Sequence, residues 1–234
     1  MTLQELMLQA RTDLDDLISP YLWADQDLVD YINYAVYVMA QDCCLIYDDY
    51  SPFTIIPVSV ALGSHYQKDP RIVRVREARL TDSLGFINEP LEWRTRDWLE
   101  NHWSNWPNAI PARPRVACEN MRTGYIRLLP APDASYMMNL IVYRLPLAPL
   151  TLNDMTASPE IEIKYHKYLK HGILSRAYLK ADNEAYDARK AETERILFVG
   201  SDDGKIEGDV KKVFNLSQVA IQTTETVGVN KAFC

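Results

Sequence analysis

Prolines limit what the middle of this 234-residue chain can fold into. Nine of the 13 prolines fall between residues 52 and 132. Proline has no backbone N–H to donate and cannot continue a helix, so this stretch can hold only short strands and edge strands. The sequence therefore predicts a β-rich region at residues 51–150.

Stretches rich in β-branched residues predict where the strands lie. They are residues 53–60, 72–80, 115–119, 125–129 and 137–143. Within the second stretch Val73 and Val75 alternate with Arg74 and Arg76. This alternation indicates a strand with one buried face and one solvent-facing side. Thr95 predicts the start of a short helix at 95–103, so we expect a small antiparallel sandwich or open barrel that a helix interrupts.

Amphipathic helices precede the β-rich region. Residues 2–18 carry an apolar stripe with three- and four-residue steps, and Thr2 with Glu5 has the signature of a capping box. A second helix is expected from Asp25 to about Ile46, packed antiparallel on the first. Its opposite face is also apolar, which means that this helix needs a second neighbour, either later helices or another subunit.

Two further helices are expected after the β-rich region. Ser158 and Pro159 predict the first turn of a helix that runs to about Ala181. Asn183 opens the last helix, and Gly200 is its expected C-cap. The fold class is therefore α+β. Residues 1–50 and 157–200 form a helical bundle, residues 51–150 an inserted antiparallel sandwich or barrel, and residues 201–234 an extended C-terminal arm.

Composition excludes several classes of protein. The net charge is −7 and the pI is near 5.2, which disfavours nucleic-acid binding as the primary function. No apolar run reaches the roughly 20 residues of a membrane span, and the N-terminus lacks signal-peptide features. The four cysteines match neither a zinc motif nor a disulfide framework, which fits synthesis in a reducing cytoplasm.

No catalytic or metal-binding motif stands out. His166 and His171 are five residues apart on a helix and so point to different faces. There is no glycine-rich phosphate loop and no nucleophile elbow. We therefore expect no enzyme activity, no catalytic residue, no cofactor and no metal.

Two residue clusters allow alternative interpretations. Four tryptophans could form a sugar-binding platform or pack in a core or a subunit contact: Trp93, Trp98, Trp103 and Trp106. The arginines of the β-rich region could contact DNA phosphates or the acidic helices of a neighbouring subunit. The acidic total favours the second reading. Possible intersubunit residues are Tyr31, Tyr34, Arg74 and Arg76.

The order of several phrases along the chain resembles the head-to-tail adaptor (connector, or tail tubular protein A-like) family of tailed bacteriophages. These phrases are Leu22-Trp23 before the second helix, Arg127-Leu-Leu-Pro-Ala-Pro132, Tyr143-Arg-Leu-Pro146, and Pro159-Glu-Ile161 with His166. The resemblance covers roughly residues 1–200.

This resemblance implies a structural virion protein in the neck, made in the host cytoplasm. It implies a dodecameric ring under the portal protein, in contact with a tail nozzle or tail tube protein, through which double-stranded DNA passes. The alternative function is a carbohydrate-binding module of a phage tail.

The arm is the expected portal-binding or neighbour-binding segment. Its candidate contact residues are Lys211, Lys212, Phe214, Leu216, Val219 and Ile221. We expect this arm to add to a partner's sheet or groove, and a chain truncated after Gly200 to fold normally.

Overall fold

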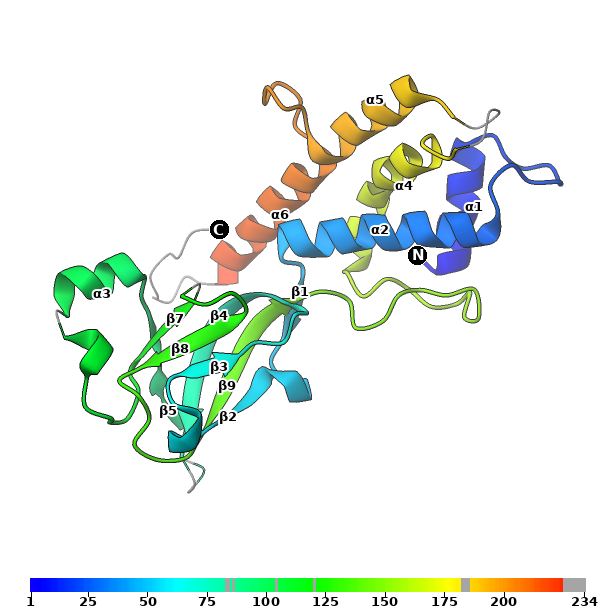
Figure 1. Ribbon diagram of the computed structural model, residues 1–234. Coiled ribbons are helices and arrows are strands. Elements are labelled where there is room, and N and C mark those ends of the chain that lie inside the picture. Colours follow the sequence, from blue (N-terminus) through cyan, green and yellow to red (C-terminus); the bar gives the residue numbers. More distant parts are fainter. Residues whose placement is uncertain (83–84, 86, 104, 120, 182–185, 225–234) are drawn as a thin grey trace. The chain divides into compact units, whose positions relative to one another are not determined.

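Figure 1 shows the computed structural model, which describes residues 1–82, 85, 87–103, 105–119, 121–181 and 186–224. The chain is α+β, as predicted, and it divides into two compact units. One contains residues 1–46 and 145–234, and the other contains residues 47–144. The sheets do not close into a barrel.

The second unit contains two sheets. The first has the order β1-β9-β4-β5, with β2 also paired to β9. Its strands are β1 (Ile46–Asp48), β2 (Ile55–Val58), β4 (Ile72–Thr81), β5 (Ile87–Pro90) and β9 (Tyr136–Arg144). The other has the order β3-β8-β7-β6, made of β3 (His65–Gln67), β8 (Tyr125–Leu129), β7 (Val116–Glu119) and β6 (Glu92–Trp93). The pair β6–β7 is parallel, so this sheet is not wholly antiparallel as expected.

One apolar core joins the two sheets into a sandwich. Leu80 and Met138 come from the first sheet, while Ile126 and Leu128 come from the second, and all four are buried in one cluster. Short helical pieces connect the strands: η1 (Pro52–Thr54), η2 (Val60–Leu62), α3 (Arg96–His102) and η3 (Trp106–Asn108). Thr95 caps α3 as predicted, because its side chain accepts a hydrogen bond from Trp98 N.

The alternation expected for β4 is only partly correct. Arg76 is exposed and Val75 is buried, but Val73 and Arg74 are both half-buried. The register against β9 shifts between Ile72 and Arg74 and again between Val75 and Glu77. A bulge adds one residue to a strand and turns the following side chains to the other face, so a strict period of two is lost.

Helices form the first unit. They are α1 (Leu3–Asp13), α2 (Asp25–Cys43), η4 (Ile163–Leu169), α4 (Lys170–Ala177), α5 (Ala188–Val199) and α6 (Asp209–Thr224). The predicted capping box is present: Glu5 N donates to Thr2 Oγ1, and Thr2 N donates to Glu5 Oε2. One core cluster includes residues of α1, α2, η4, α4, α5 and α6. Helix α4 approaches α5 so closely at Gly172 that a Cβ there would lie 2.8 Å from Phe198 Cζ.

Three helix predictions need correction. Helix α1 ends at Asp13 rather than near residue 18, and Figure 1 shows it crossing α2 steeply instead of running antiparallel beside it. Helix α2 ends at Cys43, because Cys44 turns left-handed. The helix expected from Pro159 begins only at Ile163, and its first seven residues are 3-10 helix. The predicted opening at Asn183 lies outside the described residues.

The prediction of an extended C-terminal arm is also wrong over residues 209–224. Residues 209–224 form helix α6. Val210 and Val213 are buried in the helical core, and Val210 O accepts a hydrogen bond from Cys43 Sγ at 3.2 Å. This segment therefore belongs to the helical unit, although polar residues interrupt its apolar stripe in the sequence. Gly200 is the C-cap of α5, as predicted.

Candidate interaction surfaces

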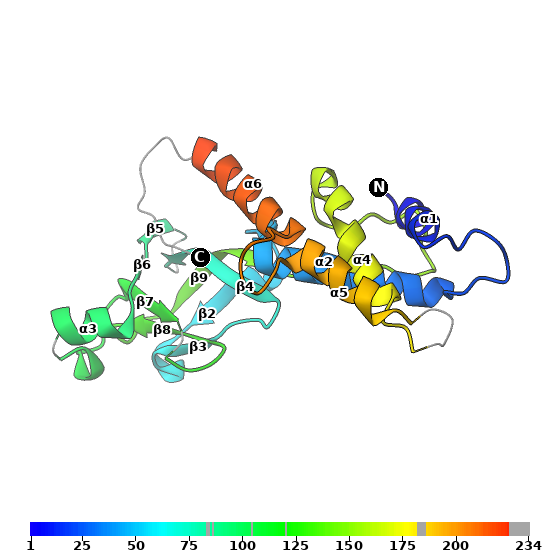
Figure 2. The same cartoon turned by 90° about the horizontal axis from the view of Figure 1, so that it is seen from above.

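A loop at residues 14–24 projects beyond α1 and α2 in both views (Figure 1, Figure 2). Arg11, buried near the end of α1, holds its base. The guanidinium pairs with Asp16 at 2.5 Å and with Asp25 at 2.6 Å, and it donates to Trp23 O at 3.0 Å. Asp16 in turn accepts the backbone N–H of Trp23. These contacts satisfy the buried charges and give the loop a fixed shape.

The tip of this loop is apolar and exposed. Ile18 is 83% exposed, and Leu17 and Tyr21 are about half exposed. Leu17 lies within residues 2–18, the range predicted for the first helix, but the helix ends at Asp13. Large apolar side chains gathered on a rigid projection are typical of protein–protein contact surfaces. Pro20 lies in this loop, but nothing in the sequence indicates that Arg11 organises it.

Beside the loop lies an open groove of about 480 Å³. One wall is the loop, and the other is the segment around the start of α5. The lining side chains are Asp13, Leu14, Asp15, Asp16, Leu22, Trp23, Tyr178, Tyr186, Asp187 and Lys190. Trp23 is fixed in place, since its indole N–H donates to Ala177 O at 3.0 Å. The groove thus combines aromatic walls with carboxylates.

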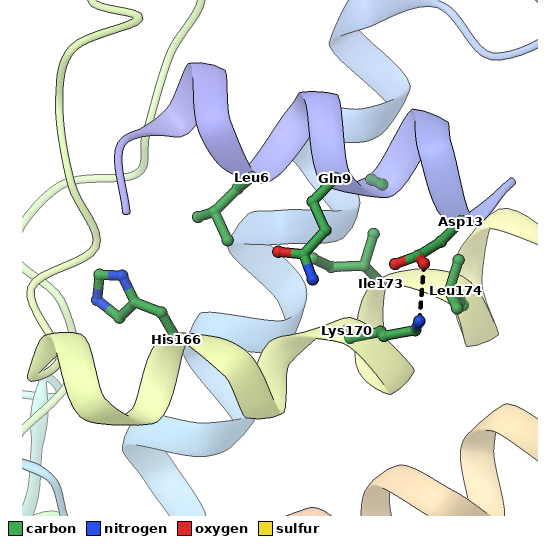
Figure 3. Close-up of a pocket in the computed structure, with 8 residues that line it drawn as sticks. Leu6, Gln9, Asp13, His166, Lys170, Ile173 and Leu174 are labelled. Atoms are coloured by element: carbon green, nitrogen blue, oxygen red, sulfur yellow. Dashed lines mark hydrogen bonds and ion pairs between the residues drawn. The ribbon is translucent and has the colours of Figure 1, made fainter. Parts of the chain in front are cut away.

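A second pocket lies between α1 and α4 and is too small for a ligand. Figure 3 shows Asp13 paired with Lys170, with His166 farther along the same cleft. The Asp13–Lys170 distance is 2.7 Å. The volume of about 10 Å³ holds roughly one water molecule. His166 is buried, and its Nε2 lies 3.0 Å from Ile161 O. Burial lowers the pKa of His166, so it is a neutral core residue near pH 7.

Metal-ligand clusters and reactive thiols are two kinds of chemical group that can be looked for in the described part of the chain. No group of three or more His, Cys, Asp or Glu side chains there could hold a metal ion. Burial raises the pKa of the Cys43 thiol to about 12 and that of Cys118 to about 11. Both thiols are therefore protonated at neutral pH, which makes them poor nucleophiles. Among the described residues, no helix is long and apolar enough to cross a membrane.

The candidate intersubunit residues have contacts within their own chain. Tyr31 is half-buried against the helical core. The ring of Tyr34 lies 3.8 Å from the guanidinium carbon of Arg176. On β4, Arg76 is exposed and Arg74 half-buried, and both have interactions inside the chain. The structure does not bring these four residues together in one unit.

The six candidate residues of the C-terminal segment lie around a helix rather than on one face of a strand. Lys211 is exposed, and Lys212 pairs with Asp209 at 2.9 Å. Phe214 packs partly on the helical core, whereas Leu216 is about half exposed. Val219 and Ile221 lie in the second half of α6, and their side chains are outside the described set.

Comparison with known families identifies the kind of protein to which these surfaces belong. Residues 1–202 match the family model described as SU10 adaptor protein. The chain belongs to this family. It is a phage head-to-tail adaptor protein and a structural component of the virion. No curated protein matches the chain.

In an adaptor the tryptophans have a structural explanation. Trp106 is 6% exposed, and the guanidinium carbon of Arg127 lies 4.6 Å from its ring centroid. Trp98 stacks on His102 with centroids 4.7 Å apart. A sugar platform needs open ring faces, so this arrangement favours packing over carbohydrate binding. The half-buried tryptophans of this group are Trp93, Trp98 and Trp103.

Proposed function

We propose that copies of this adaptor assemble into a ring between the portal protein and the tail, and that the genome passes through its lumen. The observation that carries this proposal is the family match over residues 1–202, which includes all of the β unit and the helical unit up to the end of α5. The ring is a dodecamer, in keeping with the head-to-tail adaptors that the chain resembles. A tail nozzle or tail tube protein binds its other side.

The surface of the molecule supports a role in assembly. The apolar tip of the 14–24 loop is held out from the helices by the ion pairs of the buried Arg11 with Asp16 and Asp25. A rigid, exposed apolar projection serves binding better than it serves the stability of a monomer. The net charge of −7 supports passage of DNA, because an acidic lumen does not retain phosphates.

The C-terminal segment is the proposed contact with the portal or with a neighbouring copy. Helix α6 offers Lys211 and Leu216 to a partner on the side that does not pack on α2. Lys212, Phe214, Val219 and Ile221 remain part of this proposal. The contact is helical over these residues, so we expect a helix in a groove rather than an added strand.

The test is assembly of the purified protein with its portal protein. Mass photometry gives the copy number of the adaptor alone, and negative-stain electron microscopy shows whether rings form on the portal. We expect rings with a central channel coaxial with the portal. Adaptor that stays monomeric at all concentrations, with and without portal, would exclude this function.

Truncation after Thr224 tests the C-terminal contact separately. This variant keeps the whole of α6 and removes only the last residues. Substitution of Leu216 by Asp, with Lys205→Asp as a control in the preceding turn, then tests the helix itself. Loss of portal binding in Leu216→Asp alone supports the contact, and unchanged binding in both variants rules it out.

A further inference from the structure

Acidic charge is concentrated at the start of the chain. Residues 1–46 contain eight Asp or Glu side chains, and Arg11 is their single Lys or Arg. Residues 47–144 contain 12 Lys or Arg against 11 Asp or Glu. The net charge of −7 therefore comes from the two N-terminal helices and their loop. The groove described above lies against that loop.

Two carboxylates of the groove have no cation partner in the described structure. Asp13 pairs with Lys170, and Asp16 pairs with Arg11. Asp15 is exposed and has no ion pair among the described side chains. Asp187 accepts only backbone N–H groups at the start of α5. The groove thus presents two negative charges that are free to bind a cation.

The loop at residues 109–115 in the β unit has the opposite character. No Asp or Glu occurs between Glu100 and Glu119, so the whole segment around it is basic. Arg113 and Arg115 are exposed and have no ion pair among the described side chains. Ile110 is 86% exposed.

This loop is also held in a fixed conformation. Ala112 N donates to Ala131 O at 2.9 Å, and Arg115 N donates to Leu129 O at 3.0 Å. Pro111 and Pro114 restrict its backbone further. A fixed loop loses little conformational entropy on binding, which favours its use as a recognition element.

We propose that the 109–115 loop of one copy binds in the groove of the next copy, with Arg113 and Arg115 paired to Asp15 and Asp187. The inference rests on the proposed ring, and it names the contact that closes it. A ring needs two different surfaces on each copy that fit one another, and this pair supplies them. Two guanidiniums meet two carboxylates, so the charges are opposite in sign and equal in number.

Apolar contacts accompany the charges. The groove walls carry Tyr178 and Tyr186, and Tyr186 is about half exposed. Ile110 of the neighbouring copy covers these rings. Aromatic rings that bury an aliphatic side chain at the centre of a charged rim are a common form of interface core. Lys190 also lines the groove, with its Nζ 5.3 Å from the Tyr178 ring centroid, and it forms no ion pair with Asp15 or Asp187 among the described side chains.

Charge reversal in a double-mutant cycle tests the contact. The loop variant is Arg113→Glu with Arg115→Glu, and the groove variant is Asp15→Asn with Asp187→Asn. Asn is tolerated at the left-handed Asp15, where φ is 57°, and it caps a helix as well as Asp does. The matched control reverses two exposed arginines elsewhere in the β unit, Arg96 and Arg122. All variants are measured as full-length chains.

The readout is the protein concentration at half assembly, measured by sedimentation velocity. We expect the loop variant to raise it about tenfold or more relative to the control. In the groove-variant background the same reversal should have a much smaller effect, because the carboxylates that it would repel are gone. Equal effects in both backgrounds, or no difference from the control, would overturn the contact while leaving the ring intact.

A peptide measurement keeps the contact testable without the ring. A fluorescent peptide of residues 107–117 is titrated with the full-length chain and with its groove variant. Binding that the groove variant weakens supports the contact even if no ring forms, in which case only the proposed function fails. A peptide that binds neither protein, together with an absence of assembly, refutes the contact as well.

Discussion

Asp48 and Arg144 form a buried ion pair in the β unit. Asp48 is fully buried, and it accepts hydrogen bonds from Ser51 N at 2.9 Å, Ser51 Oγ at 2.7 Å and Arg144 Nε. Burial raises the pKa of Asp48, but the hydrogen bonds from Ser51, Arg144 and Tyr50 outweigh that effect and leave the pKa below its ordinary value. The ion pair fixes β1 beside β9 in a single arrangement.

Replacing Asp48 by Asn should destabilise the β unit, because it removes the buried negative charge that faces the Arg144 guanidinium. We expect a loss of about 3 kcal/mol at pH 7, measured by urea unfolding. Because the native pKa of Asp48 is lowered, the ion pair contributes fully to the stability of wild type at pH values above the unfolded-state pKa of about 3.9. Wild type loses this contribution as the pH falls through the native pKa.

The difference in the free energy of unfolding between wild type and Asp48→Asn should therefore be constant above about pH 5 and become smaller below about pH 4. Asp49 is exposed and provides the control, with Asp49→Asn close to wild type. A difference that stays the same at all pH values would mean that the charge of Asp48 contributes nothing.

At the scale of elements, the sequence predicts best where local signals agree. The caps at Thr2, Thr95 and Gly200 were predicted, because each depends on residues adjacent in sequence. The bulges of β4 were not predicted, because they arise from its pairing with β9, which lies about 60 residues later in the chain. A connection before Asp25 was predicted, but the loop begins at residue 14 rather than after residue 18, and its organising residue, Arg11, looks like an ordinary polar residue of a helix.

Helix α6 was missed for a different reason. Val210, Val213, Phe214 and Ser217 recur at helical spacing, but one of the four is polar and the stripe is short. Tertiary packing completes it, because Ser217 Oγ donates to Cys43 O at 3.5 Å and the valines fill the core beside α2. Most of the stability of a short helix comes from such packing rather than from propensity.

Truncation after Gly200 should consequently destabilise the helical unit, contrary to the expectation from sequence that this variant folds normally. Two buried valines and part of Phe214 would be lost, so we expect the melting temperature to fall by about 10 °C. Truncation after Thr224 is the matched control and should melt like wild type. Equal melting temperatures for both truncations would show that α6 does not support the core.

The turn between α5 and α6 gives a second prediction at this scale. A Cβ on Gly208 would lie 2.3 Å from Gly200 N and 2.6 Å from Phe198 O, which are backbone atoms that cannot rotate away. Gly208→Ala should therefore force the backbone of residue 208 away from that of residues 198–200. We expect it to lower the free energy of unfolding in urea by about 1–3 kcal/mol. Lys205→Ala in the same turn should have little effect. Unchanged stability in Gly208→Ala would mean that α6 can shift without cost.

At the scale of the whole molecule, the two units divide the charge between them. The sequence predicted an acidic protein with a locally arginine-rich β region, and left open whether those arginines contact DNA or a neighbouring subunit. The structure describes Arg79 paired with Glu77, Arg94 with Glu92, and Arg96 with Glu100. Several of the arginines are thus neutralised within their own unit, which argues against a continuous DNA-binding surface.

The assembled adaptor should accordingly bind double-stranded DNA only weakly. Non-specific binding depends on unpaired cations that replace the counterions of the phosphates, and the chain carries a net charge of −7. We expect a Kd weaker than about 10⁻⁴ M at physiological salt in fluorescence anisotropy with a short duplex. Micromolar binding with a steep salt dependence would instead place the arginines of the β unit against the genome, and would make the adaptor a brake on DNA rather than a passive channel.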